Sequence, residues 1–210
     1  PTREAPRTAA LRGPRVALVG CGSIGRTIAA AFRRGVLPGR ITAVCDIRRE
    51  AAERMVRTLS PRPRIVPLRE AVRLADCVVE CATAAVVPAV VREALGRGRD
   101  VLVMSVSGIL ANPRLLGLAR RGRGRLVVPS GALGALDALR AAAVAGLDRV
   151  ELVTSKPPAS LQGAPYVRSR GMRLSGLRRP KVVFRGDARA AARGFPSNLN
   201  VAATVALAGV

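Results

Sequence analysis

Short apolar runs alternate with amphipathic stretches along the first part of the chain. Runs rich in β-branched residues predict buried strands at 16–19, 41–45, 64–66, 77–81, 100–105 and 125–128. The stretches between them repeat apolar residues at helical spacing and end at glycine or proline, which predicts helices. Strands and helices that alternate in this way are typical of an α/β fold with a parallel, doubly wound sheet, and we expect one over residues 15–129.

The pattern changes after Pro129. A helix of small residues is expected up to about Gly146, then strands at 149–154 and 181–185, and helices after Asp187 and Asn200. This mixture predicts a second, smaller α+β domain over residues 130–210, with a substrate bound between the two domains.

The two ends of the chain lack this regularity. Residues 1–14 hold three prolines and no hydrophobic period, so we expect a disordered lead-in. The sequence begins at Pro1 rather than Met and stops within an apolar helical pattern at Val210. We therefore expect a C-terminally truncated piece of a longer protein.

A glycine-rich turn follows the first expected strand. Gly20 would permit a tight turn, Gly22 would let backbone approach a pyrophosphate, and Gly25 would let the next helix pack closely on the strand. The N–H groups of Ser23 and Ile24, in the first helical turn, would face the phosphates. This arrangement predicts a Rossmann dinucleotide-binding domain; the alternative is a flavodoxin-like or other α/β domain with a glycine turn.

An acidic residue ends the second expected strand. Asp46 stands about 20 residues beyond the glycines, where its carboxylate would accept hydrogen bonds from the adenosine ribose and favour NAD. Arg48 and Arg49 follow it and would suit the 2′-phosphate of NADP, unless they are only a solvated helix start. We expect NAD or NADP as the cofactor and leave the choice open.

The loop after the strand at 77–81 reaches the carboxyl edge of the sheet. Ligands of doubly wound sheets bind outside that edge. We therefore expect Cys81, Ala82 and Thr83 to lie beside the cofactor.

The positive net charge raises the question of whether the chain binds nucleic acid. The chain has 36 basic and 13 acidic residues, for a net charge of +23. The basic residues are spread along the chain, only Lys156 and Lys181 are lysines, and aromatic residues make up 2%, so stacking platforms for bases are scarce. We expect no nucleic-acid partner; the alternative is a non-catalytic dinucleotide-binding module with affinity for polyanions.

The cysteines and the lengths of the apolar runs indicate in which cellular compartment the protein is expected. Cys21, Cys45, Cys77 and Cys81 form no CxxC pair, and the chain has no histidine, so reduced thiols and no metal are expected. No secretory signal is visible, and no apolar run reaches the roughly 20 residues that a membrane span needs. We expect a cytoplasmic protein without membrane contact.

Three motifs stand out in the second half of the chain. They are Ser-Gly-Ala-Leu-Gly-Ala-Leu-Asp at 130–137, Thr-Ser-Lys-Pro-Pro at 154–158, and Phe-Pro-Ser-Asn-Leu-Asn-Val-Ala-Ala at 195–203 after Phe184 and Gly186. Together they resemble the motifs of the L-aspartate dehydrogenase family. With the glycine turn at the front, the resemblance runs in order from Val16 to Val210. It implies a Rossmann domain, a substrate domain and NAD(P)-linked oxidation of aspartate to iminoaspartate, which hydrolyses to oxaloacetate and ammonia or feeds NAD synthesis. We also expect a homodimer.

The first two motifs suggest substrate contacts. Backbone N–H groups of Ser130, Gly131 and Ala132 would hold cofactor or a substrate carboxylate, unless they only cap a helix. Lys156, beside two stiffening prolines, would offer a fixed charge to a dicarboxylate, unless it is an ordinary surface lysine. The resemblance implies that Ala132 contacts the cofactor.

The third motif carries two asparagines at a helix entrance. Asn198 and Asn200 would hydrogen-bond the nicotinamide carboxamide or a substrate carboxylate, unless they serve only as helix caps. The resemblance implies that one asparagine of this pair is a cofactor contact.

The chain also departs from the family pattern. Arg is usual where Ser155 stands, Gly is usual at or near Ser107, and the loop at Ala84 and Ala85 is plainer than the family's. The family's proposed catalytic His lies beyond the last helix, and this chain has none, so the catalytic residue is unknown. Truncation of the sequence explains the missing histidine more simply than loss of catalysis in a pseudoenzyme does.

A homoserine or dihydrodipicolinate-type reductase shares the two-domain plan and is the alternative enzyme.

Overall fold

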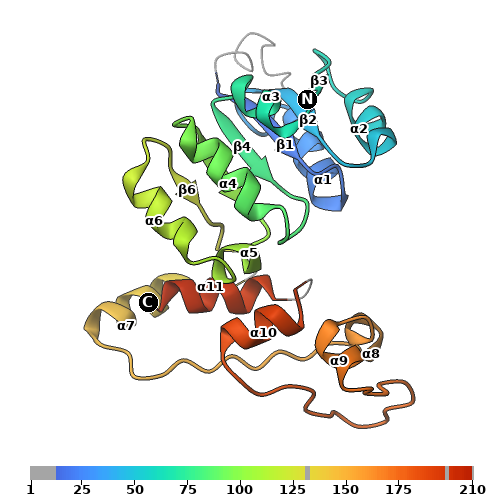
Figure 1. Cartoon of the computed structure of the whole chain (residues 1–210), viewed down its shortest axis with the longest axis vertical. Coiled ribbons are helices and arrows are strands. Elements are labelled where there is room, and N and C mark those ends of the chain that lie inside the picture. Colours follow the sequence, from blue (N-terminus) through green and yellow to red (C-terminus); the bar gives the residue numbers. More distant parts are fainter. Residues whose placement is uncertain (1–12, 131–132, 197–198, 210) are drawn as a thin grey trace, which may run out of the picture. The chain divides into compact units, whose positions relative to one another are not determined.

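The computed structural model describes residues 13–130, 133–196 and 199–209. The chain divides into two compact units (Figure 1). The first takes the chain up to Ser105 together with Arg114–Val128, and the second takes Val106–Pro113 together with the chain from Pro129 onward. Residues 106–113, which the sequence placed with the sheet, are thus grouped with the second unit.

A single parallel sheet organises the first unit. Its strands are β1 (Arg15–Val19), β2 (Arg40–Cys45), β3 (Arg64–Ile65), β4 (Cys77–Glu80), β5 (Asp100–Val103) and β6 (Leu126–Val127). They lie in the order β3-β2-β1-β4-β5-β6, and every pair is parallel. This confirms the prediction of a doubly wound sheet. The strand order reverses between β1 and β4, where such sheets bind ligands.

Helices cover both faces of this sheet. The helices of the first unit are α1 (Ser23–Arg33), α2 (Arg49–Val56), α3 (Leu68–Arg73), α4 (Val87–Gly96) and α6 (Arg114–Arg121). Consecutive residues of β1, Ala17 and Leu18, point to opposite faces, and both are fully buried. Strands buried on both sides read as continuous apolar runs, which is why the sequence pattern predicted them.

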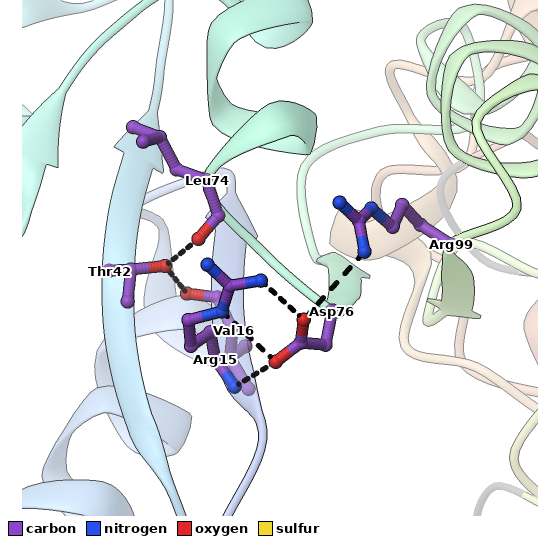
Figure 2. A network of polar contacts seen from close by, with 6 residues as sticks. All are labelled: Arg15, Val16, Thr42, Leu74, Asp76 and Arg99. Atoms are coloured by element: carbon purple, nitrogen blue, oxygen red, sulfur yellow. Dashed lines mark hydrogen bonds and ion pairs between the residues drawn. The ribbon is translucent and has the colours of Figure 1, made fainter.

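Polar side chains fasten the amino-terminal edge of the sheet (Figure 2). The Asp76 carboxylate, just before β4, accepts hydrogen bonds from the backbone N–H, Nε and Nη2 of Arg15 at 2.7–3.2 Å, and Arg99 lies 3.7 Å away. Thr42 Oγ1 donates towards the carbonyl oxygens of Val16 and Leu74. The hydrogen bonds from Arg15 lower the pKa of Asp76 to about 2.

The second unit is built from helices. They are α5 (Ser107–Leu110), α7 (Leu136–Ala145), α8 (Pro158–Leu161), α9 (Pro165–Ser169), α10 (Ala188–Gly194) and α11 (Asn200–Ala208). Helix α11 packs against α5, α7 and α10. Helix α10 begins after Asp187, as the sequence predicted, and Asp187 caps it by accepting a hydrogen bond from the Ala190 N–H. Tyr166, Phe184 and Phe195 form an aromatic cluster with ring centroids 5.2–5.6 Å apart.

The second unit differs from the prediction at the two expected strands. Residues 149–154 and 181–185 form no strand, although both segments have strand-like composition. Val153 is 81% exposed and Val182 is 64% exposed. A strand requires hydrogen bonds to a neighbouring strand, and the described part of this unit provides none. The α+β character expected for residues 130–210 is therefore not seen in the described residues.

The lengths of the helices show whether any of them could span a membrane. Among the described residues, no helix has the length and apolar character that crossing a bilayer demands.

Candidate functional site

The glycine turn joins β1 to α1 at the carboxyl edge of the sheet. Gly20 has φ +104°, and a Cβ there would lie 2.7 Å from the backbone of Cys81 and Ala82. A Cβ on Gly25 would collide with the carbonyl oxygen of Gly20. Both positions require glycine because the strand, the helix and the β4 loop meet there.

The middle glycine has the opposite surroundings. A Cβ on Gly22 would meet nothing within 4 Å, so the space beside its backbone is open. Gly22 is the N-cap of α1 and offers no side-chain cap, and the next residues, Ser23 and Ile24, are exposed. The first N–H groups of a helix lack intrahelical partners and favour anions. The residues present therefore suit the pyrophosphate of a dinucleotide.

Asp46 is tied to this turn by its own carboxylate. Its Oδ2 accepts a hydrogen bond from the Cys21 N–H at 2.6 Å, and its Oδ1 accepts one from the Arg48 N–H at 2.8 Å. The side chain is only 7% exposed. A carboxylate has about four acceptor positions, so about two remain for ribose hydroxyls. The sequence predicted the ribose role but not the bond to the turn.

The two arginines after Asp46 differ in their partners. Arg49 Nε lies 2.9 Å from Glu53 one turn along α2. Arg48 is 70% exposed, and its Nε lies 3.9 Å from Asp46 Oδ1. Of the two, Arg48 is the freer to meet a 2′-phosphate.

The thiols near the turn are held neutral. Burial raises the pKa of Cys21 and of Cys81 to about 12, and Asp46 contributes at Cys21. The Cys81 thiol donates towards the carbonyl oxygens of Val19 and Gly20 at 3.4 and 3.2 Å. Within the described residues no group of side chains is arranged to hold a metal ion. Their burial and raised pKa favour a packing role over nucleophilic attack.

The carboxyl end of β4 holds a buried acidic side chain that was not expected from the sequence. Glu80 is 0% exposed and accepts hydrogen bonds from the Ala82 N–H and from the N–H and hydroxyl of Ser105 at 2.8–3.0 Å. Burial raises the pKa of Glu80, against the opposing effect of these hydrogen bonds. The signal was present, because Glu80 is the one charged residue in the apolar run 77–81. Ala82 and Thr83 beyond it are exposed.

In the second unit, Asn200 is the first residue of α11. Its Oδ1 lies 3.4 Å from both the N–H and the hydroxyl of Ser107, and that hydroxyl is also 3.2 Å from the Pro196 carbonyl oxygen. The N-cap of α11 is Leu199, without a side-chain cap, so Asn200 does not cap the helix. Asn198 lies outside the described residues.

The expected substrate residues are partly described. Ser130 and Lys156 are both exposed, and Lys156 immediately precedes the prolines that open α8. Gly131 and Ala132 lie outside the described residues. Ala135, the N-cap of α7, has φ +58°, a left-handed conformation that alanine rarely adopts. Sequence reasoning missed this strained residue, which belongs to the motif at 130–137.

The structure thus brings the first-unit residues together. The glycine turn, Asp46 and the loop at 81–83 follow β1, β2 and β4, which are neighbours in the sheet. Direct contacts join them, from Cys21 to Asp46 and from Gly20 to the β4 loop.

Comparison with known proteins matches both halves of the chain. Residues 20–129 match the family model described as "Homoserine dehydrogenase, NAD binding domain". Residues 137–210 match the model described as "Aspartate dehydrogenase, C-terminal". The second match separates the chain from enzymes that share only its first half.

Curated relatives cover most of the chain. L-aspartate dehydrogenase 3 of Bordetella bronchiseptica is 43% identical over 197 residues, which are 93% of this chain and 72% of the relative. L-aspartate dehydrogenase of Bradyrhizobium diazoefficiens is 43% identical over 197 residues, 93% and 70% of the two chains. L-aspartate dehydrogenase of Methanosarcina acetivorans is 39% identical over 201 residues, which are 93% of this chain and 74% of the relative.

Solved structures share the fold. Aspartate dehydrogenase from Thermotoga maritima has a TM-score of 0.57 at 22% identity, covering 94% of this chain and 74% of that one. Myo-inositol dehydrogenase from Lactobacillus casei, solved with NAD(H) and myo-inositol, has a TM-score of 0.52 at 18% identity. The match covers 70% of this chain and 49% of that one.

Proposed function

Because the chain belongs to the L-aspartate dehydrogenase family, we propose that it catalyses the NAD(P)-dependent oxidative deamination of L-aspartate. The product iminoaspartate reacts with water to give oxaloacetate and ammonia. NAD or NADP, when bound, accepts the hydride that leaves the α-carbon of aspartate. The observation that carries the proposal is the open space beside the backbone of Gly22. The preceding residue, Cys21, donates its backbone N–H to the Asp46 carboxylate, which brings Asp46 to the same turn.

In this proposal the first unit is the cofactor domain. The backbone of Gly20, Gly22, Ser23, Ile24 and Gly25 receives the pyrophosphate, with the N-terminus of α1 favouring its negative charge. The remaining acceptor positions of Asp46 take the ribose hydroxyls. Cys81, Ala82 and Thr83 border the cofactor through the β4 loop, where only the last two are exposed.

The second unit supplies the substrate groups in this proposal. Ser130 and Gly131 offer backbone N–H groups to a carboxylate, and Lys156 offers the charge that selects a second carboxylate. Ala132, Asn198 and Asn200 contact the nicotinamide end of the cofactor; the bond from Ser107 supports a fixed orientation for Asn200. We place this domain at residues 130–210 and the cofactor domain at 15–129, after a lead-in at 1–14.

No catalytic base is assigned. Removal of the amine proton and activation of water call for a group with a pKa near neutrality, most often histidine. The sequence contains no histidine. We therefore propose that the chain as given binds the cofactor and turns over L-aspartate slowly.

The proposal is tested by calorimetric titration with NAD and NADP, followed by a search for aspartate-dependent NADH absorbance. We expect saturable binding by the wild type and binding weakened about tenfold or more by Asp46→Ala. Glu50→Ala is the matched control, because it removes an exposed carboxylate from the adjoining helix α2. A folded wild type that binds neither dinucleotide overturns the proposal.

We also propose that the enzyme acts in the cytoplasm as a homodimer and that its product feeds NAD biosynthesis. The family resemblance supports the link to NAD biosynthesis. Light scattering coupled to size-exclusion chromatography tests the dimer, and a monomer at micromolar concentration would contradict it.

A further inference from the structure

Glu80 combines complete burial with a position at the ligand edge of the sheet. It is the last residue of β4, the strand beside β1 at the point where the strand order reverses. A buried carboxylate is unfavourable unless its oxygens are hydrogen-bonded. Glu80 meets that condition with three donors from two segments of chain.

The two segments held by Glu80 lead to different parts of the molecule. Oε1 accepts the Ala82 N–H at 2.8 Å, which fixes the first exposed residue of the loop after β4. Oε2 accepts the Ser105 N–H at 3.0 Å, and the Ser105 hydroxyl lies 2.9 Å from Oε1. Ser105 is the last residue of the first unit before the chain passes into the second.

We propose that Glu80 is a positioning residue for the cofactor site, whose carboxylate clamps the Ala82–Thr83 loop and the Ser105 backbone in the conformation that receives the dinucleotide. The proposal rests on the proposed function, because the loop matters only if a dinucleotide binds beside it. Glu80 itself is buried and acts through Ala82 and Ser105 rather than by touching the ligand.

Substitution of Glu80 by glutamine distinguishes the hydrogen bonding of its carboxylate from the packing of a side chain of that size. Glutamine has nearly the same shape, but its amide offers one oxygen acceptor and one NH₂ donor. In Glu80→Gln the NH₂ group would face either the Ala82 N–H or the Ser105 N–H, and that contact becomes repulsive. Ser105→Ala is milder, because it removes the hydroxyl and keeps the backbone N–H.

The chain offers a matched control at the other end of the same strand. Asp76 also accepts three hydrogen bonds, all from Arg15, but lies at the amino-terminal edge of the sheet (Figure 2). Asp76→Asn therefore weakens a more exposed fastening of three hydrogen bonds away from the ligand edge. It controls for any general loss of stability.

The experiment measures NAD affinity by calorimetry, thermal unfolding, and amide hydrogen exchange at Ala82 and Ser105 in the wild type and these variants. We expect Glu80→Gln to raise the Kd for NAD about tenfold or more and to speed exchange at both amides. Ser105→Ala should raise Kd by roughly threefold, and Asp76→Asn should lower Tm while leaving Kd within about twofold.

Several results would overturn the inference. If Glu80→Gln binds NAD as the wild type does, or if Asp76→Asn weakens NAD equally, the carboxylate has no specific role at the site. Should Glu80→Gln fail to fold, an unchanged Kd in Ser105→Ala would overturn it instead. A wild type that binds no dinucleotide overturns the proposed function, whereas normal wild-type binding with an unaffected Glu80→Gln overturns only the positioning role.

Discussion

At the scale of single residues, the three glycines of the turn have different physical reasons for being glycine. Gly20 has a positive φ and Gly25 abuts the Gly20 carbonyl oxygen, so both serve the protein's own packing. Gly22 has φ −71° and ψ −162°, a conformation open to alanine, with free space where a Cβ would stand. Its side of the turn is therefore free to receive a ligand.

We predict that Gly22→Ala folds normally and binds NAD about tenfold or more weakly, because the added methyl group enters the space of the pyrophosphate. Calorimetry and thermal unfolding measure the two effects. Gly96→Ala is the control, since a Cβ there also meets nothing within 4 Å and the residue ends α4, outside the glycine turn. Equal NAD affinity in both variants would contradict the assignment of the phosphate site.

The cysteines give a second prediction at this scale. Burial raises the pKa of Cys21 and of Cys81 to about 12, which disfavours the thiolate, the reactive form, at pH 8. Burial also raises the pKa of Cys45 and Cys77. We expect the folded protein to react slowly with Ellman's reagent at pH 8, and all four thiols to react after unfolding in guanidinium. Rapid reaction of Cys21 or Cys81 in the folded state would contradict this.

At the scale of elements, the sequence predicted the sheet of the first unit well. Most of its strands contain a short apolar run, and β1, expected at 16–19, spans Arg15–Val19. The segments at 149–154 and 181–185 have similar composition but remain unpaired, because strand formation depends on partners that no local pattern contains. The bonds of Asp46 to Cys21 and of Glu80 to Ser105 join residues 25 apart, so sequence alone could not reveal them.

The start of α2 carries a prediction about cofactor choice. Arg48 is exposed and Arg49 is paired with Glu53. We expect Arg48→Ala to weaken NADP about tenfold and NAD by less than about twofold, because only NADP presents a 2′-phosphate to the guanidinium. Calorimetric titration with both dinucleotides gives the ratio. Arg54→Ala is the control, as it removes an exposed arginine from within α2, which Arg48 precedes. Equal weakening of NAD and NADP by Arg48→Ala would show that Arg48 does not contact the 2′-phosphate.

At the scale of the whole molecule, carboxylates at the two edges of the sheet respond oppositely to pH. The pKa of Asp76 is lowered to about 2 from 3.8, so its pairing with Arg15 stabilises the fold above about pH 4 and is lost as pH falls towards 2. The pKa of Glu80 is raised above 4.5, so its contribution to stability declines as pH rises from about 4.5. The two effects occupy separate pH windows.

We predict that Asp76→Asn unfolds at a lower temperature than the wild type at pH 6 and that the difference shrinks as pH falls from about 4 to 2. Once the wild-type carboxyl is protonated, it no longer holds the Arg15 guanidinium as an ion pair, and the two proteins become alike at this site. The effect is expected to be a few degrees at most, because the Asp76 side chain is 43% exposed and solvent screens the pair. Thermal unfolding followed by circular dichroism at constant ionic strength measures it.

Glu50→Gln provides the comparison for this titration. It removes one negative charge from a highly exposed carboxylate whose nearest arginine nitrogen is 3.7 Å away, so it changes the net charge equally without breaking a bidentate contact. Its unfolding temperature should follow that of the wild type across the acid range. If Asp76→Asn and Glu50→Gln behave alike, the acid sensitivity comes from the general repulsion of a chain with net charge +23 rather than from the clamp between Asp76 and Arg15.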